Sequence, residues 1–160
     1  SISQEPTMLG KITAIRVRDE RRKETRAIEV GELVVGEGLR GDRYAETLSK
    51  KPSEIDPGRE VTLIESEAID AANLEANAGL DHAQSRRNLL TRGVRLNDLV
   101  GKEFKVGETI LKGIEPCHPC MHLEKMTKPG VMKALKDRGG LRATVVSGGT
   151  IRVGDVVEAN

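Results

Sequence analysis

The sequence predicts one mainly β domain, a β-barrel with a few short helices inserted. Short runs of β-branched and aliphatic residues recur along the chain, and glycine-containing turns separate them. The regular alternation of strands and helices that is typical of a doubly wound sheet is missing. A chain of 160 residues has the size of one domain and can bury a core without disulfides or metals. We therefore expect residues 1–160 to form a single domain with its core over about 8–158.

The first half of the chain is predicted to supply three strands and one helix. Met8–Val17 and Ala27–Leu33 are rich in strand-forming residues, and Glu60–Glu65 is a short buried strand. Ser66 can cap the N-terminus of a helix that runs to about Asn77 and ends near Gly79. The segments between these elements are predicted to be turns and loops: Arg18–Thr25, Val34–Asp42 and Lys50–Gly58.

The second half is predicted to contain most of the remaining strands. Glu103–Val106 and Thr109–Ile114 flank Gly107 and Glu108, which is typical of a tight hairpin. Pro129 suits the first turn of a helix that runs to about Lys136 and stops at the following glycines. Three short strands then close the chain: Leu141–Ser147, Thr150–Val153 and Val156–Ala159.

Composition excludes several classes of function. The formal net charge is +1, and Tyr44 and Phe104 are the only aromatic side chains. Such a chain has neither the basic surface nor the stacking platform of a nucleic-acid-binding protein, and its core must be aliphatic. No apolar run is long enough to span a membrane, and the N-terminus lacks the order of a signal peptide. We expect a cytoplasmic protein with reduced thiols; the oligomeric state is unknown from the sequence.

One short segment holds both cysteines and two of the three histidines: Cys117, His118, Cys120 and His122. Its CxxC spacing allows a thioredoxin-like redox pair, but such pairs start a helix of an α/β fold. A structural zinc site would need His118, His122 or the distant His82, which is predicted to lie in a surface loop. A single working cysteine, binding a soft metal or carrying sulfur, is a third interpretation, and a pair of ordinary buried thiols is a fourth.

Arginines and glycines concentrate in three other segments: Gly38–Arg43, Ser85–Gly93 and Gly139–Arg142. Arginine binds phosphate through two parallel hydrogen bonds, and glycine lets the backbone approach a ligand closely. On one cavity wall these groups would suit an anionic cofactor with a phosphate tail; the alternative is that they are exposed charges. The candidate cofactor-binding residues are Arg40, Asp42, Arg43, Arg86, Arg87, Asn88, Arg92 and Arg142.

In order along the chain, these segments resemble the MOSC family, named for the C-terminal domain of molybdenum-cofactor sulfurases. Each match is weak alone, but the ordered set is specific and covers about residues 8–158. The chain resembles the small stand-alone bacterial type. The matching segments are Gly38–Arg43, Val61–Glu65, Arg86–Gly93, Leu99–Gly101, Pro119–Cys120, Arg138–Arg142 and Val153–Asp155.

The resemblance implies a MOSC-type β-barrel and one key cysteine, which matches Cys120. It implies that this cysteine accepts sulfur from a pyridoxal-phosphate-dependent cysteine desulfurase or ligates the molybdenum of a pterin cofactor (molybdopterin). It also implies that the arginines hold the cofactor phosphate. The alternatives are a molybdenum-dependent reductase of N-hydroxylated compounds and, below it, a zinc-stabilised or structural protein. Cys117, His118 and His122 remain secondary candidates, and we expect no haem, nucleotide or zinc.

Overall fold

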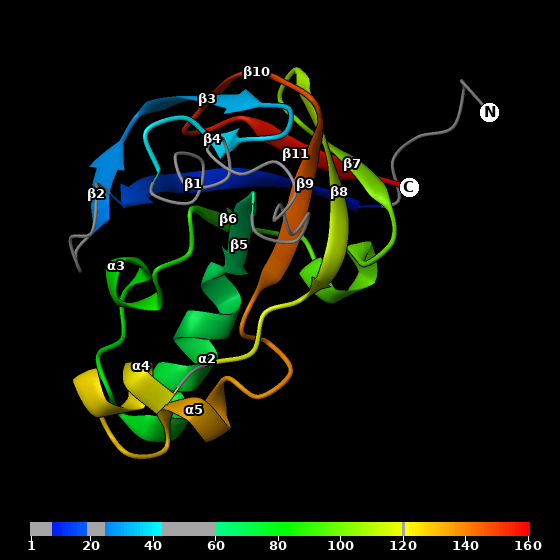
Figure 1. Ribbon diagram of the computed structural model, residues 1–160. Helices are drawn as coiled ribbons and strands as arrows, with labels where there is room; N and C mark the ends of the chain where they lie inside the picture. Colours follow the sequence, from blue (N-terminus) through cyan, green and yellow to red (C-terminus); the bar gives the residue numbers. More distant parts are fainter. Residues whose placement is uncertain (1–7, 19–24, 43–59, 120) are drawn as a thin grey trace.

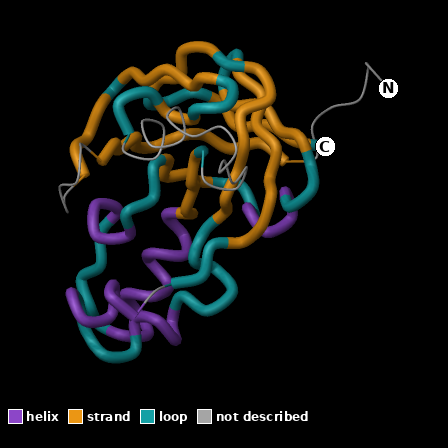
Figure 2. The backbone as a smooth tube through the Cα atoms, in the orientation of Figure 1, coloured by secondary structure: helices purple, strands orange, loops and turns teal. Residues whose placement is uncertain are grey.

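The computed structural model describes residues 8–18, 25–42, 60–119 and 121–160, without the side chains of Met121, His122 and Met126. Figure 1 shows strands wrapped into a barrel, with helices gathered at one end. The tube view in Figure 2 shows the same division between a strand-rich part and a helical part. The predicted loop Lys50–Gly58 lies outside the described residues.

Seven strands of the main sheet close into a barrel, which confirms the predicted mainly β architecture. Neighbouring strands follow the order β11-β7-β8-β9-β5-β6-β1, and β1 pairs antiparallel with β11 from Met8↔Ala159 to Lys11↔Val156. The described barrel strands are β1 (Met8–Arg18), β5 (Val61–Glu65), β6 (Leu89–Arg92), β7 (Glu103–Val106), β8 (Thr109–Pro116), β9 (Leu141–Ser147) and β11 (Val156–Ala159). The predicted hairpin is present as β7 and β8.

The prediction of one strand over Ala27–Leu33 is wrong, because the chain changes sheets there. Strand β2 (Thr25–Ile28) pairs with β1 at Ile15↔Ile28, whereas β3 (Val30–Val34) belongs to a second sheet. That sheet has the order β10-β3-β4, with β10 at Gly149–Arg152 and β4 at Gly38–Leu39 inside the predicted loop. Gly38 has φ +95, and a Cβ there would lie 1.9 Å from the carbonyl oxygen of Glu60, so only glycine fits.

One crossover joins parallel strands, a feature that the sequence interpretation missed. Strand β5 leads through helix α2 (Ser66–Ala76) and helix α3 (His82–Ser85) into β6, and Leu63 lies opposite Leu89 in the parallel pair. Parallel neighbours require such a crossover connection. The crossover ends at the α3–β6 junction, from which β6 enters the barrel.

The helices differ in detail from the prediction. Helix α2 begins after Glu65, which makes no side-chain cap, and ends at Asn77 in the left-handed region with φ 49, before Gly79. The helix predicted after Pro129 is shorter than expected. Helix α5 spans only Val131–Ala134, and Gly130 is its N-cap. The sequence interpretation missed α3, α4 (Met121–Met126) and the 3-10 turn η3 (Leu96–Leu99).

The described residues contain two aliphatic core clusters. The larger fills the barrel and includes Phe104 as its aromatic member. The smaller joins the helices to the barrel, with Ile69 and Ala72 of α2 packed against Val131 and Leu135 of the α5 region. This packing is consistent with the expected aliphatic core. Among the described helices, none has the length and apolarity needed to cross a bilayer.

Candidate functional site

Three separated arginine segments meet at one small cleft of about 50 Å³. The lining residues come from the end of β1, the segment after β4, strand β5, the α3–β6 junction and strand β9: Arg18, Asp42, Thr62, Arg86, Arg87, Asn88 and Arg142. Four guanidinium groups therefore face one carboxylate among the described lining residues. Such a wall attracts anions, and guanidinium groups suit phosphate and carboxylate oxygens.

Helix α3 fixes the position of the two consecutive arginines. A capping box between Asp81 and Gln84 starts this short helix, since each side chain accepts a hydrogen bond from the other residue's backbone N–H. Arg86 ends it in the left-handed region with φ 62. The ring nitrogen Nε2 of His82 lies 2.8 Å from the carbonyl oxygen of Arg87, to which it donates when it carries the proton. The end of helix α3 and the contact with His82 therefore fix the backbone at Arg86 and Arg87.

The side chain of Arg87 forms hydrogen bonds both to the cysteine segment and to the residues just before strand β9. Its Nε donates to the carbonyl of Gly139 at 2.9 Å, and its Nη2 donates to the carbonyl of His118 at 3.3 Å. Gly140 has φ +120, and a Cβ there would lie 2.3 Å from the carbonyl oxygen of Leu63 and 3.3 Å from Nε of Arg87. Glycine at this position therefore permits the close approach of β5 and Arg87.

Asn88 lines the cleft, but the polar atoms of its side chain form hydrogen bonds with other residues of the protein. Its Oδ1 accepts from the backbone N–H of Thr62 at 3.1 Å and from the Thr62 hydroxyl at 3.2 Å. Its Nδ2 donates to the carbonyl of Arg16 and to Oδ1 of Asp42, both at 3.1 Å. These bonds use both donors and both lone pairs of the amide. Asn88 therefore joins β1, β5 and the segment after β4 and shapes the cleft.

Cys117 lies beside the same arginines, as a buried free thiol with 3% of its surface exposed. Burial raises the pKa of the Cys117 thiol, because the thiolate loses solvation. The charges of Arg87 and Arg142, and a hydrogen bond from Arg142, oppose that rise in pKa without reversing it. Cys117 is therefore mainly a thiol at neutral pH, and thiols are poor nucleophiles.

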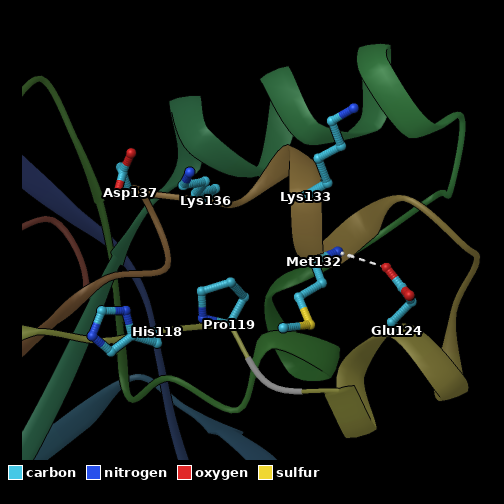
Figure 3. Close-up of a pocket in the computed structure, with 7 residues that line it drawn as sticks. All are labelled: His118, Pro119, Glu124, Met132, Lys133, Lys136 and Asp137. Carbon is cyan, nitrogen blue, oxygen red and sulfur yellow. Dashed lines mark hydrogen bonds between the residues drawn. The ribbon is translucent and has the colours of Figure 1, made fainter.

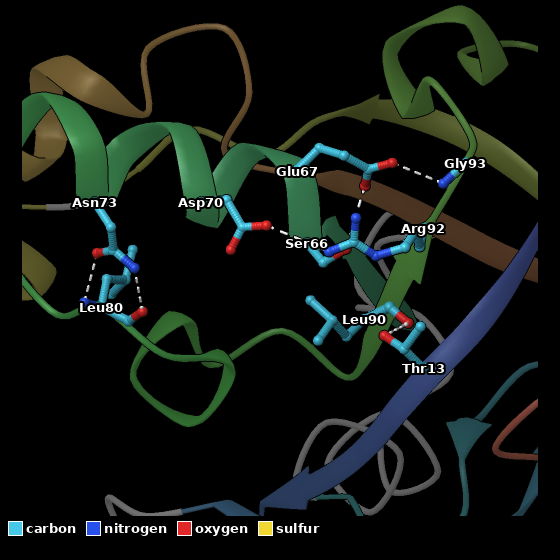
Figure 4. A network of polar contacts seen from close by, with 9 residues as sticks. All are labelled: Thr13, Ser66, Glu67, Asp70, Asn73, Leu80, Leu90, Arg92 and Gly93. Carbon is cyan, nitrogen blue, oxygen red and sulfur yellow. Dashed lines mark hydrogen bonds and ion pairs between the residues drawn. The ribbon is translucent and has the colours of Figure 1, made fainter.

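Two predicted cofactor-binding arginines do not line this cleft. Arg40 is exposed, and its backbone N–H donates to the carbonyl of Glu32. Arg92 forms an exposed ion pair with Asp70 of α2 at 3.3 Å (Figure 4). In the same network, the carboxylate of Glu67 accepts from the N–H of Gly93 at 2.7 Å. Arg43, Cys120 and the side chain of His122 lie outside the described residues.

Two lining residues, Arg18 and Thr62, were not among the candidates from the sequence. Arg18 is the last residue of β1, and the charged run around it favoured an exposed turn. Thr62 lies inside a strand whose sequence indicates only burial.

The expectation that His82 lies in a surface loop is wrong. The residue starts helix α3, and most of its ring is buried next to the α3–β6 junction. Burial lowers its pKa from 6.5 to about 4, and the nearby charge of Arg16 contributes in the same direction. The hydrogen bond to Arg87 and the charge of Asp81 oppose this shift.

This lowered pKa predicts a loss of stability in acid. Between pH 6.5 and about 4 the unfolded chain binds a proton on His82 that the folded chain does not. The free energy of unfolding should therefore fall as the pH drops through this range, by up to about 3 kcal/mol from this group. In a His82→Gln variant the amide can still donate to Arg87 but cannot titrate. Urea denaturation between pH 7 and 4.5 should give a flatter pH dependence for the variant, and equal slopes would contradict the assignment.

A second, larger hollow of about 590 Å³ adjoins the cysteine segment. Figure 3 shows Pro119 and the thioether of Met132 in its middle, with His118 on one side. The described lining residues are His118, Pro119, Glu124, Met132, Lys133, Lys136 and Asp137. His118, a secondary candidate from the sequence, thus contributes its ring to this hollow and its carbonyl to Arg87.

The described residues contain no group of three or more histidine, cysteine or acidic side chains that could hold a metal ion. The described candidate with sulfur, Cys117, contacts the guanidinium group of Arg142. Arginine side chains are therefore the main charged groups of the described site.

The fold and site together define a small closed β-barrel protein with an arginine-lined cleft next to a cysteine segment. The chain belongs to the MOSC domain family, since the model of that family matches residues 44–158. The resemblance found in the sequence is therefore confirmed. No curated protein matches the sequence.

Solved structures confirm the fold. The YuaD protein from Bacillus subtilis superposes with a TM-score of 0.80 at 16% identity, over 94% of this chain and 95% of that one. YiiM from Geobacillus stearothermophilus gives 0.71 at 14% identity, over 94% of this chain and 75% of that one. YiiM from Escherichia coli gives 0.61 at 18% identity, over 92% and 68%. At such identities the likeness concerns the fold alone.

Proposed function

We propose that this chain binds the phosphate tail of a molybdenum cofactor of the pterin type in the arginine cleft, and that Cys120 carries sulfur or ligates the metal. The observation that carries the proposal is the meeting of Arg86, Arg87 and Arg142, which are far apart in sequence, on one cleft. Membership of the MOSC family supports the same cofactor.

The size and charge of the cleft fit one part of such a cofactor. Small-molecule sites usually have volumes of roughly 300–1,000 Å³. A cleft of about 50 Å³ takes one phosphate-sized group. Two or more guanidinium groups can donate to the oxygens of that group, and desolvation by the cleft walls strengthens each contact. The residues present therefore fit an anionic tail.

The sulfur chemistry is assigned to Cys120 because this residue matches the key cysteine of the family, and Cys117 is unsuited to it. Burial keeps Cys117 protonated, and its backbone N–H is bound to the carbonyl of Gly140 at 2.8 Å. In the carrier role, the Cys120 thiolate attacks the outer sulfur of a persulfide on a cysteine desulfurase. One S–S bond forms, the donor thiolate leaves, and no net oxidation takes place. In the ligand role, the bound molybdenum supplies oxygen-atom transfer chemistry, and the thiolate is a soft ligand for it.

Mass spectrometry tests the carrier role. After incubation with a cysteine desulfurase and cysteine, Cys120 should gain the mass of one sulfur atom in the natural chain and in Cys117→Ser. The gain should be missing in Cys120→Ser. The ligand role is tested by metal and pterin analysis of protein made in cofactor-producing cells, where Cys120→Ser should lose molybdenum. Absence of the sulfur adduct together with absence of molybdenum would overturn the proposal.

A further inference from the structure

The hollow beside His118 and Pro119 is separate from the arginine cleft. The two share no described lining residue, and Arg87 lies between them, lining the cleft while donating to the carbonyl of His118. With about 590 Å³ the hollow falls in the usual range for small-molecule sites of roughly 300–1,000 Å³. Its volume alone therefore allows a whole small molecule.

The packing of α5 determines which side chains reach this hollow. Val131, Ala134 and Leu135 are buried against the helical core, so this face of the helix is occupied. Met132 of α5 and Lys136 of the turn that follows the helix both line the hollow. With Pro119 opposite, the middle of the hollow is apolar (Figure 3).

Among the described lining residues of the hollow the charges cancel, in contrast to the arginine cleft. The described lining includes Lys133 and Lys136 against Glu124 and Asp137. Glu124 is already engaged, because its Oε1 accepts the N–H groups of Gly130 at 3.0 Å and Met132 at 3.1 Å. A charged ligand would meet one repelling group for each attracting one and would also lose hydration. An uncharged ligand avoids both penalties.

We propose that this hollow binds a small uncharged organic molecule with a flat apolar body. A methionine thioether makes favourable contacts with aromatic rings, and the proline ring offers an apolar surface on the other side. The described lining contains no aromatic side chain that would fill the space. The His118 ring can donate to or accept from a polar edge of the ligand. The binding of this molecule does not depend on the proposed function. Only a role of the molecule as a substrate would rest on that function.

Methyl NMR of protein with ¹³C-labelled methionine tests the binding. Benzyl alcohol, benzoate and benzylamine have similar size and carry charges of zero, minus one and plus one. Benzyl alcohol should shift the Met132 signal, assigned with Met132→Leu, at concentrations at least about fivefold lower than either ion. The signal of Met8 on β1 should not move. Absence of any Met132 shift, or tighter binding of benzoate than of benzyl alcohol, would overturn the proposal.

A charge exchange sharpens the test. Lys136→Glu turns the balanced rim negative, so benzylamine should gain affinity, benzoate should lose it, and benzyl alcohol should change little. Lys112→Glu carries the same charge change at an exposed position of β8, outside the hollow, and should leave all three unchanged. Unchanged preferences in Lys136→Glu would contradict the charge argument.

The outcome is separable from that of the proposed function. Arg142→Gln alters the cleft but no described residue of the hollow, so it should weaken inorganic phosphate binding and leave the benzyl alcohol shift intact. If phosphate does not bind and the shift remains, the proposed function fails alone. If phosphate binds and no ligand moves Met132, the present inference fails alone.

Discussion

Replacing Arg87 with alanine should weaken inorganic phosphate binding by about tenfold or more and expose the buried thiol of Cys117. The variant loses one of the four guanidinium groups of the cleft and both bonds that hold the carbonyls of Gly139 and His118. Charge-assisted hydrogen bonds contribute about 1.5–3 kcal/mol each, and 1.4 kcal/mol corresponds to a factor of ten. Calorimetric titration with phosphate and the rate of Cys117 modification by a thiol reagent measure the two effects.

Two further variants make the Arg87 result specific. Arg92→Ala removes an arginine of the adjoining strand whose ion pair with Asp70 is exposed, so phosphate affinity and thiol reactivity should stay near those of the natural chain. Arg87→Lys keeps the charge but loses the planar fork, and should restore phosphate affinity only in part. The thiol rates are compared in a Cys120→Ser background, so that Cys117 alone reacts. Equal losses in Arg87→Ala and Arg92→Ala would contradict the assigned cleft.

Replacing Asn88 with alanine should lower the free energy of unfolding by about 3 kcal/mol or more. The substitution removes four side-chain hydrogen bonds, to Thr62 and Arg16, which are half-buried, and to Asp42, which is buried. A buried group left unsatisfied costs more than the bond itself contributed. Urea denaturation at neutral pH measures the change.

Asn97 offers a matched control for Asn88. Its Nδ2 donates to the carbonyl of Asp137 at 2.6 Å in an exposed place, where water can replace the bond. Asn97→Ala should therefore cost about 1 kcal/mol or less. A loss in Asn88→Ala as small as that in Asn97→Ala would show that the network around Asn88 does not hold the strands together.

Local signals in the sequence were sufficient for most strands. The hairpin of β7 and β8 follows from alternating residues around Gly107 and Glu108, and β1 from a long β-branched run. The break between β2 and β3 carried no such signal, because both halves have strand-forming residues and β3 pairs in the second sheet with β10, which is far away in sequence. The parallel pairing of β5 with β6 is likewise a long-range contact.

The position of an arginine at the cleft was predictable where residue type and clustering along the sequence agreed. Arg86, Arg87 and Arg142 share glycine-rich or arginine-rich surroundings, and the structure brings all three to the cleft. Arg92 has the same surroundings, but its side chain forms an ion pair with Asp70 and does not line the cleft. Whether an arginine of such a cluster faces the cleft depends on strand register, which composition does not report.

For Asn88 and His82, the sequence does not predict the hydrogen-bond partners that the structure shows. The sequence indicates the hydrogen-bonding capacity of an amide or an imidazole, but not which groups will use it. The structure assigns the amide of Asn88 to protein partners and one ring nitrogen of His82 to the carbonyl of Arg87. Both residues thus support the position of the arginines.

The pairing of β1 with β11 has a consequence for how the chain folds. Met8 meets Ala159, so the barrel cannot close during synthesis until the last strand has been made. Contacts so distant in sequence slow folding, because the entropy of a large loop must be lost before the contact forms. Until then β1 and β7 have unpaired edges where β11 will bind, and exposed edges promote association between chains. Nascent chains that lack residues 156–159 should therefore aggregate more readily than chains that contain them.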